Sequence, residues 1–354
     1  MNGHSDEHFP IREFARLTGV NPATLRAWER RYGIIKPFRT PKGHRYYGLS
    51  QVDTIKQVLY WLDKGYPIRQ VKSLLQRPDV SLTSSGPAND EWLHQQQALL
   101  TAANAFNQRG FDDLINNGFA HYPVAVYYQF CLVPVLHQLR SEKASGLVLR
   151  IFLQWLNRKL DAILQHQQRH NQGTPLIIVA SHVASISPND ARCECLIRAC
   201  ALGAAGIRVD YFDGDVDPTE LALLADKMHA YTVWLHFHPG SGAGWSSYLA
   251  NAEQQADIPH LLSGQIPDES SFSTATLSTP TLSSPASSSP ASSTPASSFS
   301  ARFTSLTQPL QQQIQYVVHN LQGGASASLP SVSPAAEKKT AEKNTTEDDH
   351  PCPQ

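Results

Sequence analysis

The chain has 354 residues, more than a single domain usually holds, so two or three domains are expected. Its five cysteines are an odd and scattered set, which argues against a disulfide framework, and the N-terminus lacks the charged-then-apolar pattern of a signal peptide. No apolar run approaches the roughly 20 residues that span a bilayer. We therefore expect a cytoplasmic protein that makes no contact with a membrane.

Charge is distributed unevenly along the chain. Residues 1–78 hold 14 of the 29 Lys and Arg but only 6 of the 30 Asp and Glu, so this segment carries +8 and the remainder −9. A basic head on an acidic body predicts that the head alone meets a polyanion.

Two short helices joined by a tight turn are predicted in the head, from "IREFARLTG" and "NPATLRAWERRYG". Asn21 is a good N-cap and Pro22 suits the first helical position of the second helix. Helical spacing then separates two faces of that helix. One carries Ala23, Arg26, Ala27 and Arg30, and the other carries Leu25, Trp28, Glu29 and Tyr32.

The face with small residues and arginines suits the major groove of DNA, because alanine permits close approach and arginine reaches phosphates or guanine edges. The helix alone fits an ordinary solvated surface helix equally well. The next segment, "IIKPFRTPKGHRYY", predicts a basic hairpin with its turn at Gly43, which is suited to the phosphate backbone. Arg31 lies between the two helix faces, level with Thr24, and is expected to meet phosphate.

Residues 9–76 resemble the winged helix-turn-helix of the MerR family of bacterial transcription regulators, through "RAWE" in the second helix and "RTPKGHRYY" in the wing. The resemblance implies a homodimer on double-stranded promoter DNA, with RNA polymerase or a signalling protein as further candidate partners. The predicted DNA contacts are Thr24, Arg26, Arg30, Arg31, Arg39, Lys42, His44, Arg45 and Tyr46. Trp28 and Tyr32 are assigned to the core of the head.

The body is predicted to contain two further domains. Residues 90–170 show helical spacing, with breaks near Gly110, Pro123 and Gly146, which indicates a four-helix bundle. Residues 174–268 alternate strand and helix patterns, as in a doubly wound parallel sheet. The Ser/Pro/Thr-rich residues 269–306 are expected to be a disordered linker and 323–354 a disordered tail, while an amphipathic helix at 307–322 is a candidate to complete the sheet domain.

This domain order resembles the cobalamin-binding regulators of the CarH and LitR type, and more closely their relatives of the MlrA type. The cobalt-binding Asp/Glu-x-His-x-x-Gly motif of that group aligns with "NDARCE", residues 189–194. Ala191 stands at the ligand histidine and Glu194 at the glycine. Alanine offers no ligand atom and Glu194 adds bulk and charge, so we expect a cobalamin-binding-like domain that holds no cofactor.

Cysteines and histidines of the body are further candidate site residues. Cys193, Cys195 and Cys200 suggest a thiolate metal sensor, but thiols two apart on a helix point in different directions, so structural thiols and no metal site are expected. His236 and His238 precede a Gly-rich stretch, interpreted as a plain turn. No catalytic constellation is apparent, and an enzyme is not expected. The alternatives to a regulator without cofactor are a cobalamin-dependent, light- or ligand-responsive regulator, and a regulator whose C-terminal domain is a protein-interaction module.

Overall fold

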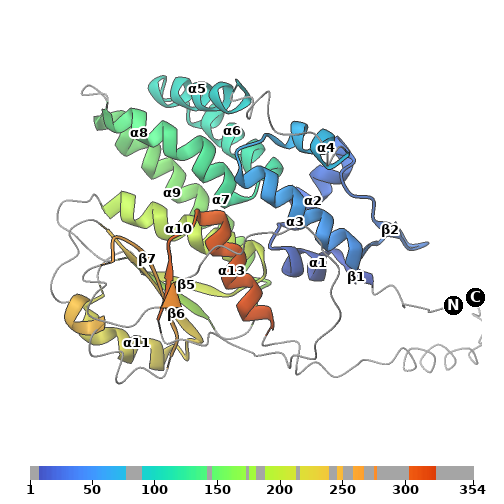
Figure 1. Ribbon diagram of the computed structural model, residues 1–354. Coiled ribbons are helices and arrows are strands. Elements are labelled where there is room, and N and C mark those ends of the chain that lie inside the picture. The colour runs from blue at the N-terminus through green and yellow to red at the C-terminus, as the bar shows by residue number, and fades with distance from the viewer. Residues whose placement is uncertain are drawn as a thin grey trace, which may run out of the picture.

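The computed structural model describes residues 8–76, 90–141, 146–172, 175–180, 188–212, 216–238, 245–249, 258–266, 275–276 and 303–323. Figure 1 shows a helical head, a helical bundle beside it, and a sheet domain that packs below the bundle. None of the helices in these ranges is long and apolar enough to cross a membrane.

The head is a helix-turn-helix with a small antiparallel sheet. Its elements are β1 (His8–Pro10), α1 (Ile11–Thr18), α2 (Pro22–Ala27), the π-helical segment η1 (Trp28–Tyr32), β2 (Phe38–Arg39), β3 (Arg45–Gly48), α3 (Leu49–Asp63) and α4 (Ile68–Gln76). The strand order is β1-β3-β2, and β2 and β3 form the predicted hairpin. Gly43 lies in its turn at a φ of 82°, where an L side chain would be strained.

A buried aromatic pair joins the first helix of the head to the wing. The rings of Phe14 and Tyr47 stack with their centroids 4.3 Å apart, and both side chains are fully buried. The helix after the wing, α3, begins at Leu49. Gln51 closes its N-terminus, because its side-chain oxygen accepts a hydrogen bond from the backbone N–H of Gly48 (3.1 Å).

The bundle follows in residues 90–168. Its elements are α5 (Asp90–Asn104), α6 (Gln108–His121), α7 (Val124–Tyr127), η2 (Tyr128–Leu132), α8 (Val133–Ser141) and α9 (Gly146–Gln168). The break expected near Gly110 falls earlier, at residues 105–107. Asn107 caps α6 by accepting a hydrogen bond from Gly110 N–H (3.0 Å), so Gly110 lies in the first turn of the helix rather than between helices.

A proline inside the third bundle helix explains why the segment before it is π-helical instead of α-helical. Pro134 has no N–H to offer to the carbonyl of Phe130, four residues earlier. The segment before it, η2, is π-helical, and the free Phe130 carbonyl accepts a hydrogen bond from Gln96 Nε2 of α5 (2.8 Å). The helix therefore continues past the proline with this carbonyl satisfied by a neighbouring helix.

The C-terminal domain is built on a six-stranded sheet in the order β5-β4-β6-β7-β9-β8, with every pairing parallel. The strands are β4 (Leu176–Ala180), β5 (Val209–Phe212), β6 (Thr232–Phe237), β7 (His260–Gly264), β8 (Ala275–Thr276) and β9 (Phe303–Leu306). The helices are α10 (Pro188–Ala204), η3 (Pro218–Glu220), α11 (Leu221–Lys227) and α13 (Leu310–Gly323).

Side chains of the buried strands alternate between two cores. Ile178 and Trp234 belong to the core shared with α10, α13, the bundle and the head. Val179 and Leu235 belong to a separate core under α11. This alternation follows from the two-residue period of a strand, and both faces of the sheet are covered, as parallel sheets require.

Residues 269–306 were predicted to form only a disordered linker, and the structure corrects this at two places. Phe303–Leu306 is strand β9, paired in parallel with β7, and Ala275–Thr276 is the edge strand β8. Helix α13 then packs against α1, α7 and α10, and Gln312 Nε2 donates a hydrogen bond to Asp63 Oδ2 of the head (2.5 Å). Residues 277–302 lie outside the described residues, as does the tail predicted at 323–354 except for Gly323, which ends α13.

Candidate nucleic-acid interface and sheet-end site

The second helix of the helix-turn-helix begins as its sequence predicts. Asn21 Oδ1 accepts a hydrogen bond from the backbone N–H of Ala23 (2.8 Å), and Pro22 occupies the first helical position. The start of the helix is therefore fixed by local interactions alone.

Two faces of this helix separate in the structure. Leu25 and Trp28 are fully buried, whereas Ala23, Arg26 and Arg30 are exposed. By helical spacing the exposed residues share one side, which presents two guanidinium groups and one small side chain. This side has the chemistry that the sequence predicted for a major-groove contact.

Glu29 ties the wing to this helix. Its carboxylate accepts hydrogen bonds from Arg39 (2.5 Å) and from Arg45 Nε (2.6 Å). Burial raises the pKa of Glu29, but the hydrogen bonds and charges of the two arginines outweigh it and lower the pKa. Arg39 and Arg45, both predicted DNA contacts, are thus engaged within the head, while Lys42 and His44 stay exposed near the tip of the wing.

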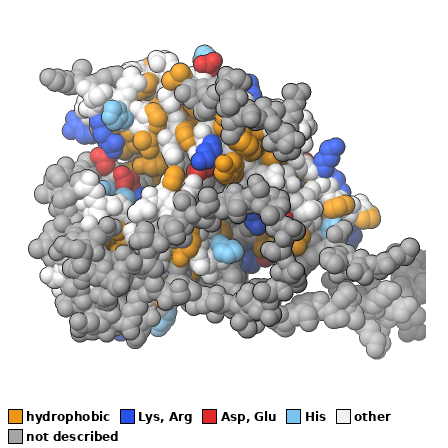
Figure 2. Space-filling model, viewed as in Figure 1, with side chains coloured by type: hydrophobic (Ala, Val, Ile, Leu, Met, Phe, Trp, Pro, Cys, Tyr) orange, Lys and Arg blue, Asp and Glu red, His pale blue; other side chains and the backbone are white. Residues whose placement is uncertain are grey.

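The outer edge of the wing carries an exposed aromatic ring. Phe38 is 57% exposed, and its ring meets that of His8 edge-on at 4.6 Å. Tyr46, a predicted DNA contact, pairs with Phe38 across the hairpin and is half-buried. In Figure 2, basic and apolar side chains gather on the side of the molecule where Figure 1 labels β2.

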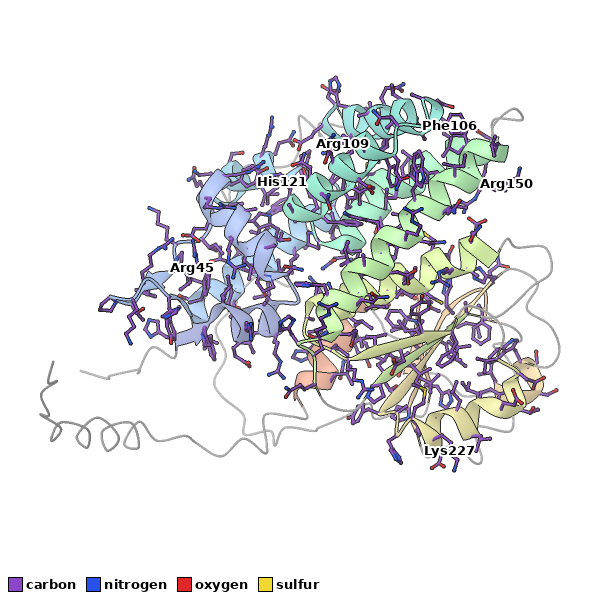
Figure 3. The ribbon with its side chains drawn as sticks, turned by 180° about the vertical axis from the view of Figure 1, so that it is seen from behind. Arg45, Phe106, Arg109, His121, Arg150 and Lys227 are labelled. Atoms are coloured by element: carbon purple, nitrogen blue, oxygen red, sulfur yellow. The ribbon has the colours of Figure 1, made fainter. Side chains whose placement is uncertain are left out.

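Helix α6 of the bundle packs against one flank of the second helix. The Thr24 hydroxyl donates to the carbonyl of Phe119 (3.3 Å), and Trp28 Nε1 donates to the carbonyl of His121 (2.8 Å). Arg31 Nη1 lies 2.6 Å from His121 Nε2. Figure 3 shows His121 where the bundle meets the head, with Arg45 farther out on the wing.

These contacts correct part of the predicted DNA-contact set. Thr24 is 1% exposed and cannot meet DNA in this arrangement, and Ala27, predicted on the groove face, is also buried. Arg31 remains exposed but is directed at His121 instead of free for phosphate. Sequence reasoning about the head alone gave no sign of this contact, because its other half lies about 95 residues away.

The ring of His121 is held in one tautomer. Nδ1 lies 2.6 Å from the carbonyl oxygen of Asn117, which accepts only from an N–H, so Nε2 is the acceptor for Arg31. Burial lowers the pKa of His121, and the charge of Arg31 lowers it further. The contact of Arg31 with His121 therefore requires a neutral imidazole.

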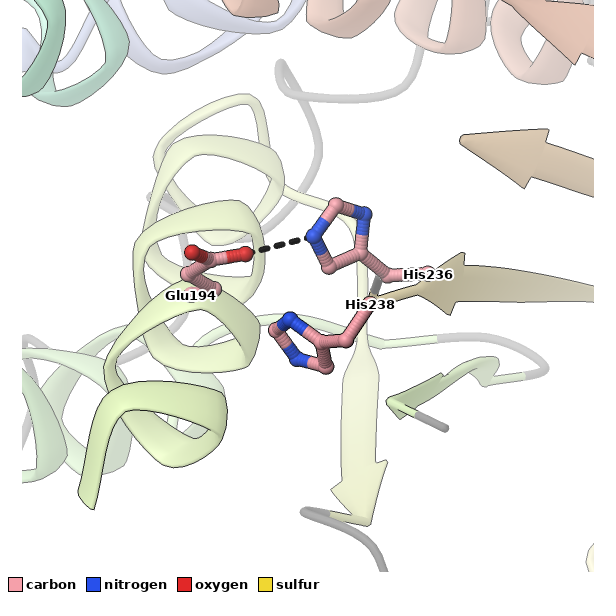
Figure 4. Close-up of side chains that lie close together, drawn as sticks. All are labelled: Glu194, His236 and His238. Atoms are coloured by element: carbon pink, nitrogen blue, oxygen red, sulfur yellow. Dashed lines mark hydrogen bonds and ion pairs between the residues drawn. The ribbon is translucent and has the colours of Figure 1, made fainter. Parts of the chain in front are cut away.

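A second group of side chains converges where strand β6 ends (Figure 4). Glu194 comes from α10, His236 from β6, and His238 follows that strand directly. Glu194 Oε2 lies 2.5 Å from His236 Nε2, and one donor atom from each of the three residues lies within 4.8 Å of the others. Both histidines are buried.

Arg198 and Ser263 fix the orientation of this group. Arg198 Nη2 lies 3.0 Å and Ser263 Oγ 2.9 Å from His236 Nδ1, so Nδ1 is the acceptor and Nε2–H faces Glu194. Burial raises the pKa of Glu194, but the hydrogen bond from His236 and the nearby positive charges lower it to about 2. Burial and the charge of Arg198 lower the pKa of His236 to about 4, which leaves a carboxylate beside a neutral imidazole.

Residues 189–194, aligned above with a cobalt-binding motif, lie at the start of α10. Ala191 is 5% exposed and presents only a methyl group. Cys193, Cys195 and Cys200 are all buried; burial raises the pKa of the Cys193 and Cys200 thiols, and Cys200 Sγ donates to the carbonyl of Leu160 (3.3 Å).

The sequence located both histidines but missed their link to Glu194. The available signal was the spacing of His236 and His238, because residues two apart on a strand face the same side. Their partner comes from helix α10, so the group becomes visible only after folding.

Comparison with known proteins agrees with the architecture of the head. Residues 9–78 match the family described as MerR HTH family regulatory protein. The chain is 30% identical over 175 residues to the HTH-type transcriptional regulator MlrA of Escherichia coli K12, covering 49% of this chain and 70% of that protein. It is 29% identical over 149 residues to the HTH-type transcriptional repressor CarH of Myxococcus xanthus, covering 40% and 50%.

Among solved structures, a more distant match is found. The methanol:cobalamin methyltransferase complex MtaBC of Methanosarcina barkeri aligns with 10% identity and a TM-score of 0.30, over 74% of this chain and 97% of that one. This likeness is too distant to assign a fold or a function.

The winged head with its exposed arginine face, carried on a helical and parallel-sheet body, defines a DNA-binding transcriptional regulator. More closely, the chain belongs to the MerR family of helix-turn-helix regulators, as its sequence predicted.

Proposed function

We propose that this regulator acts as a homodimer on promoter DNA, with Arg26 and Arg30 reading the major groove and Lys42 holding the phosphate backbone. The observation that carries the proposal is the shared exposure of Arg26 and Arg30 on the face opposite Leu25 and Trp28. A two-fold dimer presents this face twice, which suits a palindromic site.

The test is operator binding by the full chain at several salt concentrations, with molecular mass measured by light scattering in the same buffers. Each neutralised phosphate releases counterions, so affinity is expected to fall steeply between about 50 and 200 mM salt. Affinity that does not change with salt, or a bound species of one chain per operator, contradicts the proposal.

The sheet domain is proposed to be a cobalamin-binding-type domain that no longer holds the cofactor. Its residues do not fit cobalamin. Ala191 offers no ligand atom for cobalt, and the Glu194 carboxylate is hydrogen-bonded to His236. Helix α10 also packs directly on α9 and α7 of the bundle. In this proposal the body serves dimerisation and contacts with partner proteins.

Cofactor loss is tested by incubating the full chain with cobalamin, removing free ligand by gel filtration and recording the visible spectrum. We expect no corrin absorption in the protein fraction. A retained, stoichiometric corrin band supports the alternative, a cobalamin-dependent regulator.

We further propose that full insertion into DNA requires the head to leave α6. Thr24, Ala27 and Arg31 lie on the flank that α6 faces, next to the exposed groove face. The major groove is about 12 Å wide and admits a single helix between its phosphate walls, so a second helix packed along this flank competes with one wall. Docking of the head on the bundle is thus proposed to limit DNA affinity.

A further inference from the structure

The three side chains at the end of β6 are a donor set that suits a metal ion. Two imidazoles and one carboxylate are common ligands of zinc and of other divalent first-row metals. They come from different elements, α10 and the end of β6, and one donor atom of each lies within 4.8 Å of the other two.

The position of the group in the fold also favours a ligand site. Open parallel sheets bind ligands at the carboxyl ends of their strands, and His236 and His238 lie at the end of β6, between its neighbours β4 and β7. Figure 4 shows both imidazole rings turned toward the Glu194 carboxylate from the strand side.

A neighbouring hydroxyl is placed to support a bound imidazole. Metal-ligating histidines usually hold their second ring nitrogen in a hydrogen bond, and Ser263 Oγ lies 2.9 Å from His236 Nδ1. The hydroxyl donates to this nitrogen in the metal-free state and is equally able to accept from it once the proton sits on Nδ1.

We propose that Glu194, His236 and His238 bind one divalent ion of the zinc class, with the remaining coordination position open. The ion takes the place of the proton on His236 Nε2, and the imidazole proton then sits on Nδ1. Ligand atoms about 2 Å from a tetrahedral ion lie roughly 3.3 Å apart. The Glu194–His236 contact of 2.5 Å therefore opens by under about 1 Å, and all three donor atoms already lie within 4.8 Å of one another.

Arg198 is the group that the ion must displace. Its guanidinium lies 3.0 Å from His236 Nδ1 and 3.9 Å from Glu194 Oε2, so it competes with a cation for both. When Nδ1 carries a proton, Arg198 can no longer donate to it. Replacing this cation by an apolar side chain of similar length, Arg198→Met, is expected to tighten metal binding.

The experiment is equilibrium dialysis of the full chain, produced without a histidine tag, against Zn²⁺, with bound metal measured by elemental analysis. About one Zn²⁺ per chain is expected to resist dialysis against metal-free buffer. Glu194→Gln, His236→Asn and His238→Asn should each lose this ion, and Zn²⁺ should raise the Tm of the wild type but not of these variants. Circular dichroism checks that each variant is folded.

The chain provides a matched control for surface binding. His166 and His170 are exposed, one turn apart on and just beyond α9, with ring centroids 5.6 Å apart, an arrangement that attracts metal ions adventitiously. The double variant His166→Ala/His170→Ala should keep the dialysis-resistant ion. A wild type that retains no ion, or loss in this double variant with retention in the three site variants, overturns the proposal.

The spectrum of bound cobalt(II) distinguishes this site from binding by cysteine thiols. Loading with Co²⁺ should give visible bands of a nitrogen- and oxygen-ligated ion without the near-ultraviolet charge transfer of a thiolate. A thiolate band shows that a cysteine binds the metal and overturns the proposal.

Discussion

The indole N–H of Trp28, in the second helix of the DNA-binding head, donates a 2.8 Å hydrogen bond to the backbone carbonyl of His121, the last residue of bundle helix α6. Trp28 is fully buried, so leaving its indole N–H without an acceptor would cost free energy of folding. The head is therefore docked on the bundle through the same helix that presents Arg26 and Arg30.

Weakening this docking should increase DNA binding. His121→Ala removes the ring that faces Arg31 but keeps the backbone carbonyl used by Trp28. Losing this side-chain contact should destabilise the docked head by about 1 kcal/mol. We therefore expect a roughly fivefold gain in operator affinity, measured by fluorescence anisotropy. The exposed bundle residue His94 provides the control, because His94→Ala should leave affinity unchanged. Unchanged or weaker binding by His121→Ala would count against a docked, DNA-limiting head.

Docking should weaken on acidification. The pKa of His121 in the docked head is lowered, mainly by burial and also by Arg31. Between that value and the ordinary value near 6.5, the undocked form binds more protons, so the docked form loses stability as the pH falls through this window. The stabilisation of the wild type relative to His121→Asn should be larger at pH 7.5 than at pH 5.5 in thermal unfolding. An equal difference at both values contradicts this assignment.

Arg30 and Lys42 should differ in how they affect DNA recognition. Arg30→Ala is expected to cost about 1–3 kcal/mol on the operator and to relax base preference at one position. Lys42→Ala should weaken operator and random DNA alike and make the salt dependence shallower by about one unit. Lys227→Ala, on α11 far from the wing in Figure 3, should change none of these. If both variants lost the preference for operator over random DNA equally, the proposed orientation of the head on DNA would be wrong.

Glu29 should matter more for stability than an exposed acidic residue of the head. Glu29→Gln removes the charge that holds Arg39 and Arg45, and we expect a loss of about 1–3 kcal/mol in urea unfolding of the full chain. Asp53 pairs with Lys56 on the surface, and Asp53→Asn should stay within about 0.5 kcal/mol of wild type. Similar effects of the two substitutions would mean that Glu29 does not anchor the wing.

Two glycines should respond oppositely to alanine. A Cβ at Gly118 of α6 would overlap the ring of Tyr127, whereas one at Gly146, the first residue of α9, meets nothing within 4 Å among the described residues. Gly118→Ala should destabilise by about 1–3 kcal/mol through overpacking, and Gly146→Ala should be neutral or slightly stabilising. The order of their Tm values relative to wild type is the measurement, and a stabilised Gly118→Ala would refute the packing of α6 on α7.

The sequence by itself determined the elements whose signals are local. Asn21 and Pro22 start the second helix, Gly43 turns the wing, and the run at 176–180 forms a buried strand, because caps, turns and hydrophobic period depend on neighbours within a few residues. These same signals, together with the motif resemblance, sufficed to identify a DNA-binding regulator of the MerR family.

Tertiary structure decided what depends on distant partners. Phe303–Leu306 lies in a segment whose composition indicates disorder, yet it becomes a strand because β7 offers an open parallel edge. Thr24 is buried because α6 packs over it. His236 meets Glu194 only because a helix and a strand 42 residues apart in the chain are brought together at the end of the sheet. Local patterns carry no information on such pairings, since the energy that selects them comes from burial and charge across the folded core.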